Sequence, residues 1–160
     1  MTGRPGRRSG DSDAREAFLE AARGAFAPID PREVVASVVD GDRAEIGQRL
    51  VRTFLTVWDG PAGSAGIALI RSAAGNRLSG KLLREFIVTQ ILGKVHLGLD
   101  LDPADVRLRV SLVASQIVGL AMVRYVLRVE PLASAPPDLI IATLGPVVQH
   151  FLTGDLSPDG

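Results

Sequence analysis

The stretch from Gly75 to Leu82, GNRLSGKL, is the part of the sequence that comes nearest to a known catalytic motif. In a phosphate-binding loop, G-x-x-x-x-G-K-[ST], backbone N–H groups and the lysine hold the phosphates, and the last hydroxyl binds magnesium. Leu82 stands where that hydroxyl is required. The preceding residues, 66–74, have the pattern of a helix, whereas the loop needs a strand before it. We therefore expect a turn between helices, and a nucleotide-binding protein that uses Gly75–Lys81 is the least favoured alternative.

Other catalytic or metal-binding patterns are lacking. The chain has no cysteine and two histidines, His96 and His150, which have no further metal-ligating residues at a suitable spacing. No Gly-x-Ser-x-Gly elbow occurs, and most carboxylates fall at expected helix starts or on polar faces. The sequence predicts no enzyme, no metal site and no cofactor.

Polar residues on apolar helical stripes indicate a binding pocket. Gln90 is in phase with Phe86 and Ile87, and Gln116 falls between Leu112 and Val123. A buried polar group without a partner costs about 1–3 kcal/mol, so such residues either bond inside the core or line a cavity. Small-molecule sites are mostly apolar with a few polar groups. The predicted pocket residues are Phe54, Trp58, Arg71, Phe86, Gln90 and Gln116. Core packing is the alternative for each of them.

Composition indicates a small helical domain. Lys and Arg together number 18, as do Asp and Glu, so the net charge is zero and gives no global attraction to nucleic acid or an anionic membrane. Apolar residues make up 46% and aromatic residues 4%, so the core must be aliphatic. Absence of cysteine and of an N-terminal secretion signal fits a cytoplasmic protein.

Helix start and stop signals divide the chain into helices. Asp13 with Glu16 and Asp42 with Glu45 are capping pairs, and Asp30 with Pro31 is a further start signal. No segment alternates with period two. The predicted fold class is all-α, a helical bundle, preceded by a flexible arm (1–12) and followed by a flexible tail (155–160). The expected helices are 13–27, 31–41, 42–58, 64–74, 80–97, 102–128 and 136–152.

The two late helices are apolar on more than one side. Segment 106–127 has too short an uninterrupted apolar run for a membrane span, which needs about 20 residues. A helix of this kind must be covered on several sides, and in a small chain a second copy can provide one cover. A fully buried central helix in a monomer is the alternative. The predicted homodimer interface contains Leu112, Gln116, Gly119, Val123, Leu139, Leu144, Val147, Val148 and Phe151.

Several sequence segments, taken in their order along the chain, resemble those of TetR/AcrR-type transcriptional regulators. They include AREAFLEAARGAFA (14–27), LVRTFLTVW (50–58) and LVASQIVGLAMVRYVLRVEPLAS (112–134). The resemblance implies a body, 28–154, that dimerises through its last two helices and binds an unknown small apolar effector. It also implies that residues 13–27 are the first helix of a DNA-binding head. Arg4, Arg7 and Arg8 match the basic arm that contacts the DNA backbone.

The resemblance stops where the DNA-reading helices should be. Ala27 joins the body directly at about Asp30, so the recognition helix that would enter the major groove is missing. The chain is therefore expected to dimerise and to bind DNA only if a head is supplied. The alternative is an adaptor that pairs with an intact regulator and removes it from DNA.

Overall fold

The computed structural model describes residues 31–75 and 103–156, together with the single residues 10, 12, 13, 16, 17, 20, 24 and 81. Every regular element in these residues is a helix, which confirms the all-α prediction. The elements are α2 (Pro31–Val39), the 3-10 turn η1 (Arg43–Glu45), α3 (Ile46–Asp59), α4 (Pro61–Gly75), α7 (Pro103–Leu120), the π-helix η3 (Ala121–Val126) and α8 (Pro137–Thr153). The helix expected over 80–97 and the arm 1–12 lie almost wholly outside the described residues, as do most of 13–27.

Local signals account for most of these boundaries. Asp42 caps η1, because its Oδ1 accepts a hydrogen bond from the Ala44 N–H at 2.9 Å. Gly60 ends α3, and Pro61 begins α4 because proline suits the first helical position. Helix α4 therefore starts before Ser64, the residue at which the sequence predicted it. Pro137 begins α8 in the same way.

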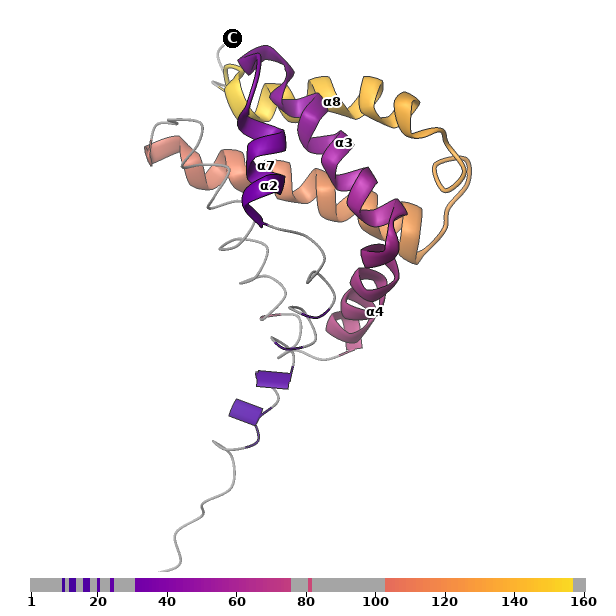
Figure 1. Cartoon of the computed structure of the whole chain (residues 1–160). Helices are drawn as coiled ribbons and strands as arrows, with labels where there is room; N and C mark the ends of the chain where they lie inside the picture. Colours follow the sequence, from indigo (N-terminus) through magenta and orange to yellow (C-terminus); the bar gives the residue numbers. More distant parts are fainter. Residues whose placement is uncertain are drawn as a thin grey trace, which may run out of the picture.

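The core lies between α2, α3, α7 and α8. In Figure 1, α8 lies across the top of the view, α7 runs below it, α2 and α3 cross in front, and α4 extends from the end of α3. Aliphatic side chains from all four helices meet inside, as the low aromatic content predicted. The buried set is Val38, Ile46, Leu50, Val51, Leu55, Val113, Leu120, Ile140, Ile141, Val148 and Leu152.

Two glycines allow α3 and α8 to cross closely. A Cβ added to Gly47 would meet the carbonyl oxygen of Gly145 and would lie 2.5 Å from the Gln149 nitrogen. A Cβ on Gly145 would lie 3.0 Å from the Gln48 Cα. The Gly47 N–H donates to Gln149 Oε1 at 2.8 Å, which bonds the two helices at this crossing.

The last turn of the long apolar helix is wider than predicted. Helix α7 continues as η3, where the Leu127 N–H donates to the Met122 oxygen at 2.8 Å, five residues back. The turn ends at Arg128, which has a positive φ of 55°. The prediction of one regular helix to Arg128 is therefore wrong in its final turn. Such π-turns occur often at functional sites.

Candidate functional site

A cleft of about 450 Å³ lies where α3, α4 and η3 meet. Its volume is within the range of about 300–1,000 Å³ that is typical of small-molecule sites. Helices α3 and α4 supply one side, and η3 with the loop that follows it supplies the other. The lining residues are Asp59, Ser64, Ile67, Arg71, Arg124, Tyr125, Arg128 and Ala133.

An acid, a phenol and a guanidinium form the inner part of the cleft. The Tyr125 hydroxyl donates a hydrogen bond to Asp59 Oδ1 at 2.8 Å. The same oxygen lies 3.9 Å from Arg124 Nη2, at the outer limit of an ion pair. Asp59 is the last residue of α3, so this group ties the end of α3 to η3.

Arg124 also fixes the loop before α8. Its side chain is buried, with 9% exposed, and Nη1 donates to the carbonyl oxygens of Leu132 at 2.8 Å and Ala135 at 2.9 Å. Its Nε has no hydrogen-bond partner among the described residues. A buried guanidinium is stable only when it is paired or hydrogen-bonded, and these contacts meet that condition for most of the group. Arg124 is therefore a charged residue built into the wall of the cleft.

Burial raises the pKa of Tyr125 to about 12, and the hydrogen bond to Asp59 adds to this effect. Both causes favour the neutral phenol, because a phenolate would be poorly solvated and would face a carboxylate. Tyr125 therefore stays a hydrogen-bond donor near neutral pH and is unsuited to act as a base.

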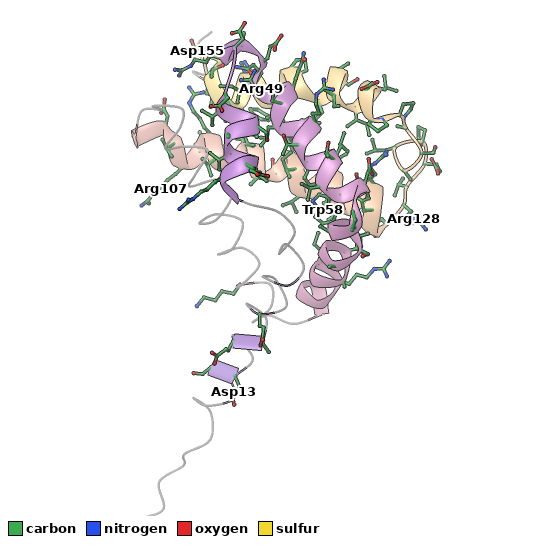
Figure 2. All side chains as sticks on the ribbon, in the orientation of Figure 1. Asp13, Arg49, Trp58, Arg107, Arg128 and Asp155 are labelled. Atoms are coloured by element: carbon green, nitrogen blue, oxygen red, sulfur yellow. The ribbon has the colours of Figure 1, made fainter. Side chains whose placement is uncertain are left out.

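Aromatic rings stand behind Tyr125. The ring centroid of Trp58 is 5.4 Å from that of Tyr125 and 5.3 Å from that of Phe54. Gly66 of α4 leaves room for the indole, since an added Cβ would lie 3.2 Å from the Trp58 ring. Figure 2 shows Trp58 near the junction of α3 and α4. Phe54 and Trp58 thus support the cleft through Tyr125.

The predicted pocket residues do not all line the cleft. Arg71 lines the cleft, whereas Phe54 and Trp58 lie one layer behind it. Gln116 is half-buried on α7, where its Nε2 donates to Ser115 Oγ at 3.3 Å, and it does not line this cleft. Phe86 and Gln90 lie outside the described residues.

Sequence reasoning missed the cleft residues other than Arg71. Arg124 interrupts an otherwise apolar run, and a charge in such a run was the available signal for a buried, functional arginine. Asp59 follows directly on the helix expected over 42–58, and no sequence motif around it indicates a site. Its pairing with Tyr125, 66 residues away, has no local signature.

A second feature is an exposed apolar surface on α7 and α8. Leu108 on α7 is 59% exposed, and on α8 Leu139 is 58% and Val147 is 41% exposed. Gly119 is also exposed, and an added Cβ there would meet nothing within 4 Å. Leu112 and Val123, also on the predicted interface, are half-buried on the same helical unit. We call Leu108, Leu112, Gly119, Val123, Leu139 and Val147 the α7–α8 surface.

One predicted interface residue packs wholly into the protomer, and two others pack into it in part. Val148 is fully buried, so it belongs to the core and cannot contact a partner. Leu144 and Phe151 are half-buried and pack against the core cluster. Helix α8 has both an inward and an outward apolar side, and the sequence pattern did not separate them.

The segment Asp105–Val126 is long and apolar enough, by length and composition, to cross a membrane. The sequence argument that it is too short therefore does not hold. However, Arg124 within it is buried and bound to loop carbonyls, and its N-terminal turns carry the charged residues Arg107 and Arg109. These contacts favour a helix that packs against protein.

The phosphate-loop resemblance receives no support at its N-terminal end. Residues Pro61–Gly75 form a helix, whereas a phosphate-binding loop follows a strand. Apart from Gly75 and Lys81, the loop-like residues lie outside the described part of the chain.

Comparison with known proteins identifies the family. The pattern of tetracyclin repressor-like C-terminal domains matches residues 44–152, which contain the cleft and the α7–α8 surface. A crystal structure of a TetR-family regulator from Streptomyces coelicolor A3 is similar, with 30% sequence identity and a TM-score of 0.60. The match covers 92% of this chain and 99% of the Streptomyces chain. No curated protein matches the sequence. The chain belongs to the TetR family of transcriptional regulators.

Proposed function

We propose that this chain is the effector-sensing and dimerisation body of a TetR-family regulator and that it acts as a cytoplasmic homodimer rather than as an enzyme. The observation that carries the proposal is the α7–α8 surface. Large apolar side chains are exposed on two neighbouring helices within the matched domain. Large apolar side chains that stay exposed on packed helices favour an interaction site.

A second copy suits this surface better than lipid does. Ser111 and Ser115 are exposed on α7 among the apolar residues, and such polar groups fit a protein interface better than a hydrocarbon core. The open space around Gly119 lets a partner helix approach the backbone. Full burial of an exposed leucine or valine stabilises the dimer by about 1.5–3 kcal/mol. In a two-fold interface each such residue is buried twice.

Two matched valines test the interface. Val147 on the α7–α8 surface is 41% exposed, and Val129 in the loop after η3 is 48% exposed. We expect Val147→Asp to shift the chain to a monomer in light scattering, because a carboxylate would be buried in an apolar interface. Val129→Asp, the control, leaves the dimer intact. Equal behaviour of the two variants would contradict the proposed interface.

The cleft is placed where a ligand can influence the dimer. Its residues Arg124 and Tyr125 belong to η3, which continues directly from the dimerisation helix α7. We therefore expect a ligand that contacts η3 and α4 together to change the orientation of α4 relative to α7. This arrangement supports effector sensing, and the test is a change in the dimer dissociation constant on ligand binding.

Specific DNA binding requires a reading head that we propose is missing after Ala27. In a band-shift experiment the chain alone is expected to retain no operator fragment, whereas a fusion to the head of a related regulator restores retention. Sequence-specific binding by the unmodified chain would overturn this part of the proposal. Pull-down with a co-expressed intact homologue tests the adaptor alternative, since the α7–α8 surface would be shared.

A further inference from the structure

The charges in the cleft identify the chemical class of the effector, and this inference rests on the proposed function. Among the described residues that line the cleft are three guanidinium groups, those of Arg71, Arg124 and Arg128, and a single carboxylate, Asp59. The carboxylate already accepts the Tyr125 hydroxyl and lies 3.9 Å from Arg124. Within this part of the lining, the positive charges of Arg71 and Arg128 are therefore not compensated.

The two outer arginines are available to a ligand. Among the described residues neither Arg71 nor Arg128 forms an ion pair or a side-chain hydrogen bond, and both side chains are exposed. Arg128 also has a positive φ of 55°, a backbone conformation that is unfavourable for a non-glycine residue. Such strain is concentrated at binding and switching sites. Figure 2 shows Arg128 at the corner between η3 and α8, on the side where α4 leaves α3.

A buried charged side chain forms part of the inner wall of the cleft. Arg124 is nine-tenths buried and held by the Leu132 and Ala135 carbonyls, and it presents a fixed positive charge in addition to the two exposed ones. Ile67, Ala133 and the Tyr125 ring supply apolar surface in the same cleft. Guanidinium pairs recognise carboxylate and phosphate oxygens with charge-assisted hydrogen bonds.

We propose that the effector is a small organic anion: a carboxylate or phosphate ester whose oxygens bind Arg71 and Arg128 and whose apolar or aromatic body rests on Ile67 and Tyr125. This proposal differs from the small apolar effector that was expected from the sequence. The cleft volume of about 450 Å³ suits a molecule of this size.

The single tryptophan provides the readout. Trp58 stacks near Tyr125, so its fluorescence responds to a ligand placed on that ring. The full-length chain is titrated with benzoate, phenyl phosphate, the neutral isostere benzamide and inorganic phosphate. We expect benzoate or phenyl phosphate to bind about tenfold or more tightly than benzamide, since one charge-assisted pair contributes at least that factor. Inorganic phosphate is expected to bind more weakly than phenyl phosphate, because it lacks the apolar body.

A pair of double variants distinguishes anion binding in the cleft from a general effect of positive surface charge. Arg71→Gln/Arg128→Gln is expected to weaken binding of the preferred anion by about tenfold or more. The control is Arg52→Gln/Arg107→Gln, which removes two exposed arginines outside the cleft and should leave binding unchanged. Arg107 lies far from Arg128 in Figure 2. All four positions are exposed, so both variants are expected to fold, and circular dichroism checks this.

Any of three results would overturn the inference. They are no binding of either organic anion up to about 10 mM, benzamide binding as tightly as benzoate, or equal affinity in the cleft and control variants. Light scattering on the same samples distinguishes this failure from failure of the proposed function. A dimer that ignores organic anions refutes only the anionic effector, whereas a monomer refutes the regulator body itself.

Discussion

The Gly47–Gly145 crossing gives the sharpest stability prediction. In Gly47→Ala the new methyl would meet the Gly145 carbonyl oxygen and would lie 2.5 Å from the Gln149 nitrogen and 2.8 Å from its Cβ. The first two of these are backbone atoms, so no rotamer change relieves the contacts. The two helices must move apart by roughly 1 Å, and overpacking of this kind costs about 1–3 kcal/mol.

Two smaller effects adjust this value. Separation weakens the bond from the Gly47 N–H to Gln149 Oε1, which is 2.8 Å long, and such a bond contributes about 1 kcal/mol. Alanine in a helix regains up to about 1 kcal/mol over glycine. The net destabilisation is therefore about 2 kcal/mol, which lowers Tm by about 4–8 °C for a chain of this size.

Urea and thermal unfolding, followed by circular dichroism at one fixed protein concentration, measure the effect. Gly24→Ala is the control, because an added Cβ there meets nothing within 4 Å. Gly145→Ala should be less harmful than Gly47→Ala, since its nearest contact is the flexible Gln48 Cγ at 2.7 Å. If Gly47→Ala unfolds with the same midpoint as Gly24→Ala, the close approach of α3 and α8 is wrong.

Two further predictions concern the inner cleft. Tyr125 is the single tyrosine, so phenolate absorbance should titrate with a midpoint near pH 12, and Asp59→Asn should lower that midpoint toward the ordinary value of about 10. The pKa of Tyr125 is higher in the folded chain than in the unfolded chain, so the neutral phenol stabilises the folded state fully below pH 10, and this contribution is lost as the pH rises toward 12. A midpoint of 10 in the folded chain would contradict the hydrogen bond. Arg124→Met should lower the free energy of unfolding by about 2–4 kcal/mol, because it leaves the Leu132 and Ala135 carbonyls without their donor. Denaturant unfolding checks this value, and an unchanged midpoint would show that these hydrogen bonds add no stability.

The sequence predicted the helices best where a boundary has a local chemical cause. Asp42 and Pro137 begin their elements as expected, because capping and proline geometry act within one turn. Gly63 and Gly66 lie inside α4, which begins at Pro61 rather than at the predicted Ser64. Their missing side chains make room for Trp58, a reason that only the packed structure reveals.

The cleft was harder to predict because its parts are distant in the chain. The pairing of Asp59 with Tyr125 and the hydrogen bonds of Arg124 depend on how η3 is wound, and a π-turn has no reliable sequence pattern. Helices α7 and α8 carry apolar side chains on an inward and on an outward side, as the sequence predicted. Which side faces the core, as Val148 does, and which faces outward, as Val147 does, follows from the α3–α8 crossing.

Sedimentation equilibrium of the unmodified chain tests the central claim most directly. We expect a dimer of twice 16.9 kDa that dissociates only on strong dilution. A particle of 16.9 kDa at every concentration, with Leu108, Leu139 and Val147 exposed to water, would contradict it.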